Sequence, residues 1–284
     1  MELLIFLIDG LLLGFVYGVA AMGLTLIWGV MNVINLAHGP IISLGGFGVY
    51  LLFTSLGVNP YLALALTAVL GLLLGIGIYW IAIQRVIDAP HLSTLLATFS
   101  INMILIGLGT AIFSTTPRNV AYDLGSLTIG TITMPRARLI AAFAALVVAG
   151  ALYLFLYRTT PGKHVRAVAN NRSAAELMGI NSSQILALSF GLGTMLAATA
   201  GGLIATIFPF TILSGSTYEL KSFVISVLGG LGNPLGALAG GLVLGMMEGL
   251  IPAFLPITWV PVLEFLLFVL ILLFRPTGLF GAKR

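Results

Sequence analysis

The chain has 284 residues, of which 60% are hydrophobic and only 7% charged, and its mean hydropathy is +1.17. A soluble globular domain carries about 25% charged residues, so this composition excludes one and predicts a polytopic membrane protein. The net charge of +4 is small and sits in loops, which argues against nucleic-acid binding, and the absence of cysteine excludes disulfides and cysteine-bound metals.

The N-terminal segment predicts a retained membrane helix over residues 3–28. A helix needs about 20 apolar residues to cross a bilayer, and this segment lacks the basic start of a cleaved signal peptide. After it, Asn32, Asn35 and His38, followed by a Gly-Pro pair, interrupt the hydrophobicity. The interruption indicates either a loop or a discontinuous helix whose free backbone groups face a cavity, at or near the cytoplasmic side.

Seven further segments have the length and composition of spans. They cover residues 40–56, 61–83, 92–114, 139–156, 183–208, 235–251 and 257–274. A shorter apolar piece at 218–231 either completes a ninth crossing or re-enters the membrane from one side. The expected fold is therefore all-α: a single transmembrane domain over residues 1–284, surrounded by membrane lipid, with about eight or nine spans.

Two polar stretches decide the expected orientation. The loop at 115–138 combines Thr, Ile, Val and Tyr with glycines, which favours a small surface hairpin. The stretch at 158–181 is more basic than this loop, so the positive-inside rule places it in the cytoplasm and the loop outside. Counting spans then puts the N-terminus outside. A cytoplasmic C-terminus requires an even number of crossings after the basic stretch, which favours nine in total. The cytoplasmic C-terminus is supported by the basic tail residues Arg275, Lys283 and Arg284.

The run RAVANNRSAAELMGIN, at 166–181, has the pattern of a short amphipathic helix. Asn171 or Ser173 is a suitable N-cap, and Gly179 is a suitable end. The apolar face would consist of Ala167, Ala174, Ala175, Leu177 and Met178. On spacing alone, the run indicates a capped cytoplasmic connector.

Three motifs resemble those of one transporter family. They are GLTLIWGVMNVINLAHG, RAVANNRSAAELMGIN and FVISVLGGLGNPLGALAGGLVLG. In the same order, they resemble the permease subunits of bacterial ABC importers for branched-chain amino acids, of the LivH-like kind. The resemblance implies a multi-pass permease of the bacterial inner membrane that translocates branched-chain or related small amino acids. Its implied partners are a LivM-like second permease, two ATP-binding subunits and a periplasmic substrate-binding protein.

The same resemblance implies a segment that couples the permease to the ATPases. The matching residues are Arg166, Ala167, Asn170, Ala174, Ala175, Glu176, Gly179, Ile180 and Asn181. A short rigid helix with small residues suits a groove on an ATPase, and Arg166 and Arg172 are expected to meet acidic rims there. No cofactor, metal site or catalytic residue is expected in this chain. ATP and magnesium would be bound by the partners, because the sequence has no Walker-type Gly-Lys-Ser/Thr run.

Two uncharged clusters are candidates for a translocation path. Asn32, Asn35 and His38 offer hydrogen bonds to a zwitterion or an amide without a trapping charge, although a helix cap and turn explains them equally well. The second cluster comprises the glycines of the GGLGNP turn, which favour a close helix approach or a turn inside the membrane. They are Gly229, Gly230 and Gly232.

Acidic residues inside spans are the charged candidates. Glu248 lies in an apolar span, where a charge costs about 2.5–3.5 kcal/mol, unless it reaches water near the end of that span. Glu264 raises the same question in the last span. Glu219 and Lys221 lie two residues apart in a polar patch, and they are expected at the membrane rim.

Other functions are open to the same sequence. One is an importer permease for urea or short amides, which is similar to this family. Another is an ion-coupled transporter that works alone, which would need buried charges in several spans; Glu248 and Glu264 are the only candidates, and this disfavours it. A membrane enzyme is disfavoured because no paired carboxylates, histidine cluster or activated nucleophile is recognisable.

Overall fold

The computed structural model of the chain describes residues 2–129, 132–275 and 277–280. Within them, eight helices are long and apolar enough to cross a membrane, which confirms the expected all-α class. The helices are α1 (Glu2–Met31), α2 (His38–Leu56), α3 (Pro60–Ile78), α4 (Gln84–Val86), α5 (His91–Phe113), α6 (Arg136–Arg158), α7 (Thr160–Asn170), α8 (Arg172–Leu177), α9 (Ser182–Ala205), α10 (Gly215–Gly229), α11 (Pro234–Leu250) and α12 (Val260–Phe274). A π-helical turn at Tyr79–Ile83 joins α3 to α4, and short 3-10 turns cover Ile212–Ser214, Ile251–Ala253 and Ile257–Trp259.

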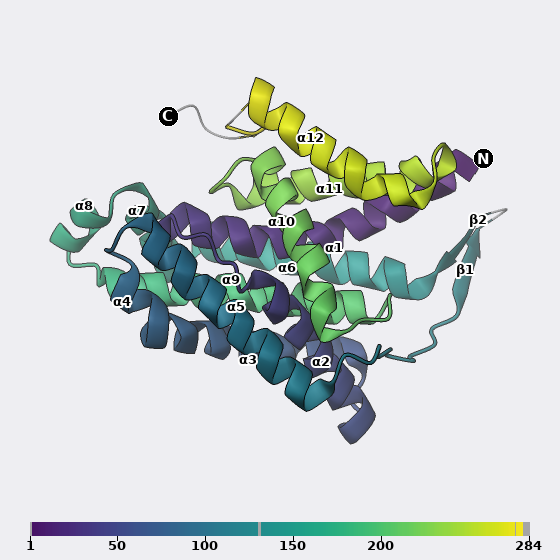
Figure 1. Cartoon of the computed structure of the whole chain (residues 1–284), viewed down its shortest axis with the longest axis horizontal. Coiled ribbons are helices and arrows are strands. Elements are labelled where there is room, and N and C mark those ends of the chain that lie inside the picture. The colour runs from purple at the N-terminus through teal and green to yellow at the C-terminus, as the bar shows by residue number, and fades with distance from the viewer. Residues whose placement is uncertain (1, 130–131, 276, 281–284) are drawn as a thin grey trace.

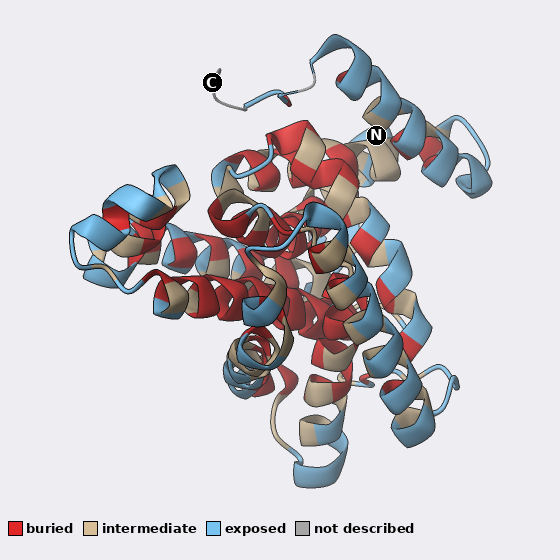
Figure 2. Ribbon diagram, turned by 60° about the vertical axis from the view of Figure 1, so that its left-hand side comes forward, coloured by how far each residue is buried: buried red, intermediate tan, exposed pale blue. Residues whose placement is uncertain are grey.

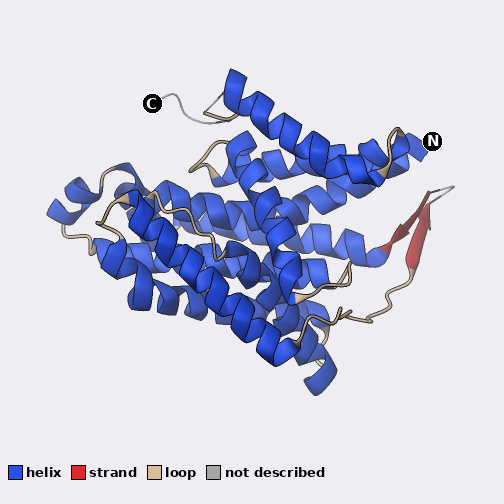
Figure 3. Ribbon diagram, viewed as in Figure 1, coloured by secondary structure: helices blue, strands red, loops and turns tan. Residues whose placement is uncertain are grey.

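The long helices form a bundle with two distinct ends (Figure 1). At one end, strands β1 (Ser126–Ile129) and β2 (Ile132–Pro135) form the antiparallel hairpin expected in the 115–138 loop (Figure 3). At the other end lie α7 and α8, which belong to the basic stretch 158–181. We refer to these as the hairpin end and the island end. The N-terminus lies at the hairpin end, where an ion pair between Arg138 and Asp9 joins α6 to α1.

Helix α9 is the centre of the bundle. In its most apolar window 89% of residues are buried, against 11% for both α5 and α12. Its Gly, Ala, Ser and Thr residues allow α1, α2 and α3 to approach closely, which is how membrane helices gain packing energy. Figure 2 shows the contrast between the buried helices in the middle and the exposed α12.

Helices α1 and α11 share the most extensive contact in the bundle. They run antiparallel along a seam of glycines, in which Gly14 faces Gly241 and Gly29 faces Gly232. A Cβ atom on Gly14 would lie 2.7 Å from the carbonyl oxygen of Gly241 and 2.9 Å from the Cα of Leu242. Only glycine therefore permits this backbone-to-backbone approach.

Helix α2 begins in the middle of the bundle. After α1 reaches the island end, residues 32–37 turn back along it, so that His38 contacts Ala20 of α1. At 1.5 Å per residue, Ala20 lies about 16 Å from the end of α1. The expected break after the first span is therefore a re-entrant connection, which starts at the island end and returns to mid-depth.

Helix α10 repeats this arrangement in the opposite direction. After α9 reaches the hairpin end, Phe210 pairs with Arg118 in the loop that follows α5, and the chain then turns back. Helix α10 begins at Gly215, which packs against the Gly39 backbone, and ends at the island end. The short apolar piece expected at 218–231 thus belongs to a crossing made by an extended segment followed by a 15-residue helix.

The last described residues lie at the island end. Leu279 donates its backbone N–H to the carbonyl of Leu228, and the Asn233 side chain donates to the carbonyl of Phe280. The C-terminal segment and α7 are therefore on the same side of the bundle, as the even number of crossings requires. The tail residues Lys283 and Arg284, which entered the orientation argument, lie outside the described residues.

Candidate functional site

The basic stretch folds as two helices where a single short helix was expected over 166–181. Helix α7 ends at Asn170, the backbone of Asn171 is extended, and α8 follows at a new angle. The Asn171 side chain accepts a hydrogen bond from the N–H of Ala174 at 2.9 Å, which confirms Asn171 as an N-cap. The short helix expected between an Asn171 cap and Gly179 is α8, whereas the separate helix α7 before it was not expected, because an Asn with an extended backbone ends one helix and starts the next.

Arg172 fixes the position of α8. Its guanidinium donates to Asp88 in the connection before α5, at 2.7 Å, and to Glu176 one turn on, at 3.1 Å. Glu176 also accepts a hydrogen bond from the Ser182 hydroxyl at the start of α9. The hydrogen bonds from Ser182 and then from Arg172 hold the pKa of Glu176 below its usual value, because they stabilise the carboxylate.

Arg166 is also engaged within the chain. Its Nε donates to the carbonyl of Leu156 at 3.0 Å, and its guanidinium lies 4.5 Å from the centre of the Tyr157 ring. Both arginines that were expected to meet acidic rims on a partner therefore hold α7 and α8 against the bundle.

The apolar face expected for the segment is divided between the interior and the surface. Ala175 is buried, whereas Leu177 and Met178 are 89% and 82% exposed at the tip of α8. Gly179 follows with φ = +83°, a conformation that favours glycine, and turns the chain toward α9. The remaining residues of the segment flank this tip: Ala174 is exposed, Ile180 donates its N–H to the carbonyl of Ala175, and Asn181 caps α9.

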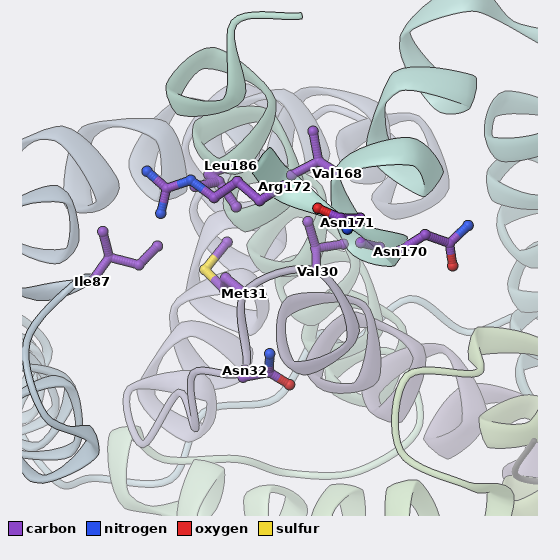
Figure 4. Close-up of a pocket in the computed structure, with 10 residues that line it drawn as sticks. Val30, Met31, Asn32, Ile87, Val168, Asn170, Asn171, Arg172 and Leu186 are labelled. Carbon is purple, nitrogen blue, oxygen red and sulfur yellow. The ribbon is translucent and has the colours of Figure 1, made fainter. Parts of the chain in front are cut away.

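A polar hollow of about 500 Å³ lies between the segment and the bundle (Figure 4). Asn170 and Arg172 line it from the basic stretch, Asn32 from the end of α1, and Ile87 from the connection before α5. Asn32 has φ = +52°, which allows the chain to reverse after α1. The hollow therefore lies between Asn32, a candidate path residue, and the candidate coupling segment. Ala167, another residue of that segment, is partly buried in α7.

Asn35 and His38 lie next to each other at the start of α2 and do not line this hollow. His38 is buried, and its Nε2 donates to the carbonyl of Ala20 at 2.9 Å, while Asn35 accepts the N–H of Ala37 at 3.1 Å. These are helix-start and turn contacts. Asn35 Nδ2 and His38 Nδ1 have no hydrogen-bond partner among the described residues.

The glycines of the GGLGNP turn are packed at the island end. Gly229 lies against the backbone of Gly236, Gly230 against Gly278, and Gly232 against Gly29. They make close backbone approaches at this end, and none of them lines the hollow in Figure 4.

A charged cluster joins α10 to α11 and α12. Lys221 of α10 forms ion pairs with Glu248 of α11 and, at 3.3 Å, with Glu264 of α12. Its ammonium also lies 4.8 Å from the centre of the Tyr17 ring of α1. The expectation that Lys221 lies at a rim was wrong, because its side chain is only 11% exposed and neutralises carboxylates from two neighbouring helices.

The expectation that Glu219 lies at the membrane rim was also wrong. Glu219 is buried on α10 and lies against the Gly39 backbone at the start of α2. Helix α2 has no capping side chain of its own, so the Glu219 carboxylate stands at its free N–H groups. Glu219 thus supports the mid-depth start of α2.

A cavity of about 280 Å³ adjoins the charged cluster. Its walls are Tyr17, Phe208, Ser214, Thr217, Tyr218, Lys221 and Glu248. The two tyrosine rings are 6.0 Å apart. We refer to it as the Lys221 cavity. Sequence reasoning missed Lys221, although two acidic residues in apolar spans already implied that a buried cation must balance them.

Among residues with described positions, no group of three His, Asp or Glu side chains is arranged to hold a metal ion. The expectation that the chain binds no metal or cofactor stays a prediction.

Comparison with known proteins gives a consistent result. A family model described as the permease component of branched-chain amino acid transport systems matches residues 6–274. The permease protein LivH of Escherichia coli K12 is 30% identical over 96% of this chain and 94% of its own length. BraD of Pseudomonas aeruginosa is 30% identical over 97% and 94%, and a probable LivH of Methanocaldococcus jannaschii is 30% identical over 92% and 87%. No solved structure matches the chain.

Proposed function

Because the chain belongs to the family of branched-chain amino acid transport permeases, we propose that it is the membrane permease subunit of an ABC importer for branched-chain amino acids. The observation that carries the proposal is the match over nearly the whole chain, together with eight helices that are able to span a membrane. The protein is a multi-pass protein of the bacterial inner membrane. It performs no chemistry, and ATP and magnesium are bound by its partners.

The partners follow from the same family. An importer of this kind needs ATPase subunits and a substrate-binding protein, and here we infer two ATP-binding subunits and a LivM-like second permease. The exposed apolar helices α5 and α12 support the second permease, because they present apolar surface on either side of α10 (Figure 1). We further propose that a path between two permeases at this face includes Glu248, with Asn32 and the Gly229–Gly232 turn at its island-end exit, and that Asn35 and His38 contribute through the start of α2.

The basic stretch is the site of ATPase coupling. Its tip presents Leu177 and Met178 to solvent, whereas Arg166 and Arg172 hold its base. An exposed apolar pair on a fixed six-residue helix suits a groove on another protein. Movement of that tip is then passed to the bundle as a rigid-body motion through the Arg172 contacts. We therefore infer that the island end is cytoplasmic and that the N-terminus lies outside.

Transport by the assembled complex tests the proposal. The chain, its second permease, the ATPases and the binding protein are reconstituted in proteoliposomes, and ATP-dependent uptake of labelled leucine and labelled urea is measured. We expect saturable leucine uptake that stops when the ATPases are inactivated. Urea uptake with leucine ignored would replace the proposed substrate class, and leucine uptake by the chain alone would refute the importer assignment.

A further inference from the structure

We propose that the Lys221 cavity is a transient binding site for the zwitterionic backbone of an α-amino acid. In this site the Lys221 ammonium takes the substrate carboxylate, and the Glu248 carboxylate takes the substrate ammonium. The inference rests on the proposed function and specifies where, and by which groups, the permease meets its substrate.

The charge of the cluster is the first argument. Two carboxyl groups, Glu248 and Glu264, share one ammonium, so the formal charges of the cluster sum to one negative charge. The Glu264 side chain is only 5% exposed, and its Oε1 has no hydrogen-bond partner among the described residues, because its 3.3 Å contact with Lys221 lacks hydrogen-bond geometry. A charge left incompletely paired inside a membrane protein is costly, which makes such a residue a candidate for function.

The arrangement of the three groups is the second argument. Glu264 holds Lys221 from α12, so Lys221 keeps a counter-ion when Glu248 turns to another partner. A ligand with adjacent positive and negative groups replaces both halves of the Lys221–Glu248 pair at once. No buried charge is left without a partner during this exchange. A simple cation, in contrast, would be repelled by Lys221, and a simple anion would be repelled by the excess carboxylate.

The shape and walls of the cavity are the third argument. Its volume of about 280 Å³ is just below the range for ligand sites, about 300–1,000 Å³, which suits a ligand as small as a single amino acid. Phe208 and the rings of Tyr17 and Tyr218 offer an apolar surface to the side chain of the substrate, and the rings also favour an ammonium group. An uncharged amide such as urea could use neither ionic contact.

The location of the cavity agrees with a passing substrate. It lies between α1, α10 and α11, and the segment that follows α9 closes one of its sides. Because the substrate must displace an existing ion pair, its net binding is weak, and a weakly held substrate leaves readily.

Equilibrium binding tests the inference. The permease–ATPase complex without its binding protein is placed in lipid nanodiscs and titrated with labelled leucine. Unlabelled leucinamide, which lacks the carboxylate, and 4-methylpentanoate, which lacks the ammonium, are added as competitors. We expect both analogues to compete at least tenfold less well than leucine. Equal competition by either analogue would overturn the inference, and this arm requires no variant.

Variants give an independent arm. The triple variant Lys221→Met, Glu248→Gln, Glu264→Gln removes all three charges together and leaves no unpaired one, and Asp123→Asn in the exposed hairpin loop is the matched control. We expect leucine binding to be lost in the triple variant and retained in the control. Undiminished leucine binding by the triple variant would refute the proposed binding site and leave the proposed function intact. Failure of the wild-type assembly to import leucine with its binding protein would instead refute the proposed function.

Discussion

Glycine is required at positions 14 and 241 because the backbones of α1 and α11 touch there. A side chain at either position would meet main-chain atoms, which cannot rotate away as the end of a flexible side chain can. The abundance of glycine in the sequence predicted close helix packing. It did not show which pairs of glycines meet, because most of the long helices contain several glycines.

Gly14→Ala is expected to destabilise the folded protein by about 1–3 kcal/mol, the usual cost of overpacking a tight interface. Gly150→Ala in α6 is the matched control, because a Cβ at that position meets no atom within 4 Å. Heat-induced loss of the monodisperse peak in detergent measures the effect. A Gly14→Ala protein as stable as the control would show that the α1–α11 contact is looser than described.

The difference between Glu248 and Lys221 shows the limit of residue-level prediction. A carboxylate in an apolar span was recognisable from sequence because its cost in lipid is known. Lys221 stands in a polar patch, and nothing in its neighbourhood along the chain shows that α11 and α12 bring two carboxylates to it. Long-range pairing of this kind is decided by helix packing.

At the scale of elements, the basic stretch consists of a base that is held and a tip that is free. Hydrogen bonds of Arg172 to Asp88 and Glu176 fix the base, whereas Leu177 and Met178 have no covering residues. The composition of the segment indicated its cap and its final glycine. Its division at Asn171 depends on backbone geometry that the hydrophobic pattern does not encode.

Leu177→Asp and Met178→Asp are expected to reduce the ATPase stimulation caused by the loaded binding protein by tenfold or more. Both side chains are exposed, so folding is unaffected while the apolar contact with the ATPase is lost. Leu127→Asp on β1, at the opposite end of the bundle, is the control. The proposed coupling role would be rejected by normal stimulation in a variant that still assembles with its ATPases.

At the scale of the whole molecule, hydropathy located the spans to within a few residues. It could not distinguish a helix that crosses the entire bundle from one that begins at mid-depth, because the mean hydropathy of α2 equals that of the fully crossing helix α9. The return of residues 32–37 and the half-length of α10 depend on contacts such as that of His38 with Ala20.

The orientation of the bundle is testable because the chain has no cysteine, so a single introduced thiol is labelled without background. In right-side-out spheroplasts, a membrane-impermeant maleimide is expected to label Asp123→Cys and to leave Lys163→Cys unlabelled. After the membrane is permeabilised, both should react. Labelling of the Lys163→Cys protein from outside would reverse the bundle and remove the coupling role of the basic stretch.

The paired half-helices have a consequence for how such a bundle switches. The segment from α1 to α5 and the segment from α9 to α12 use the same order of elements in opposite directions, with the starts of α2 and α10 meeting at Gly39 and Gly215. In transporters built from two such halves, alternating access is largely a rigid-body rocking of one half against the other around a fixed site. The Gly39–Gly215 contact, where the two halves meet, is then the contact about which such a rocking motion would take place.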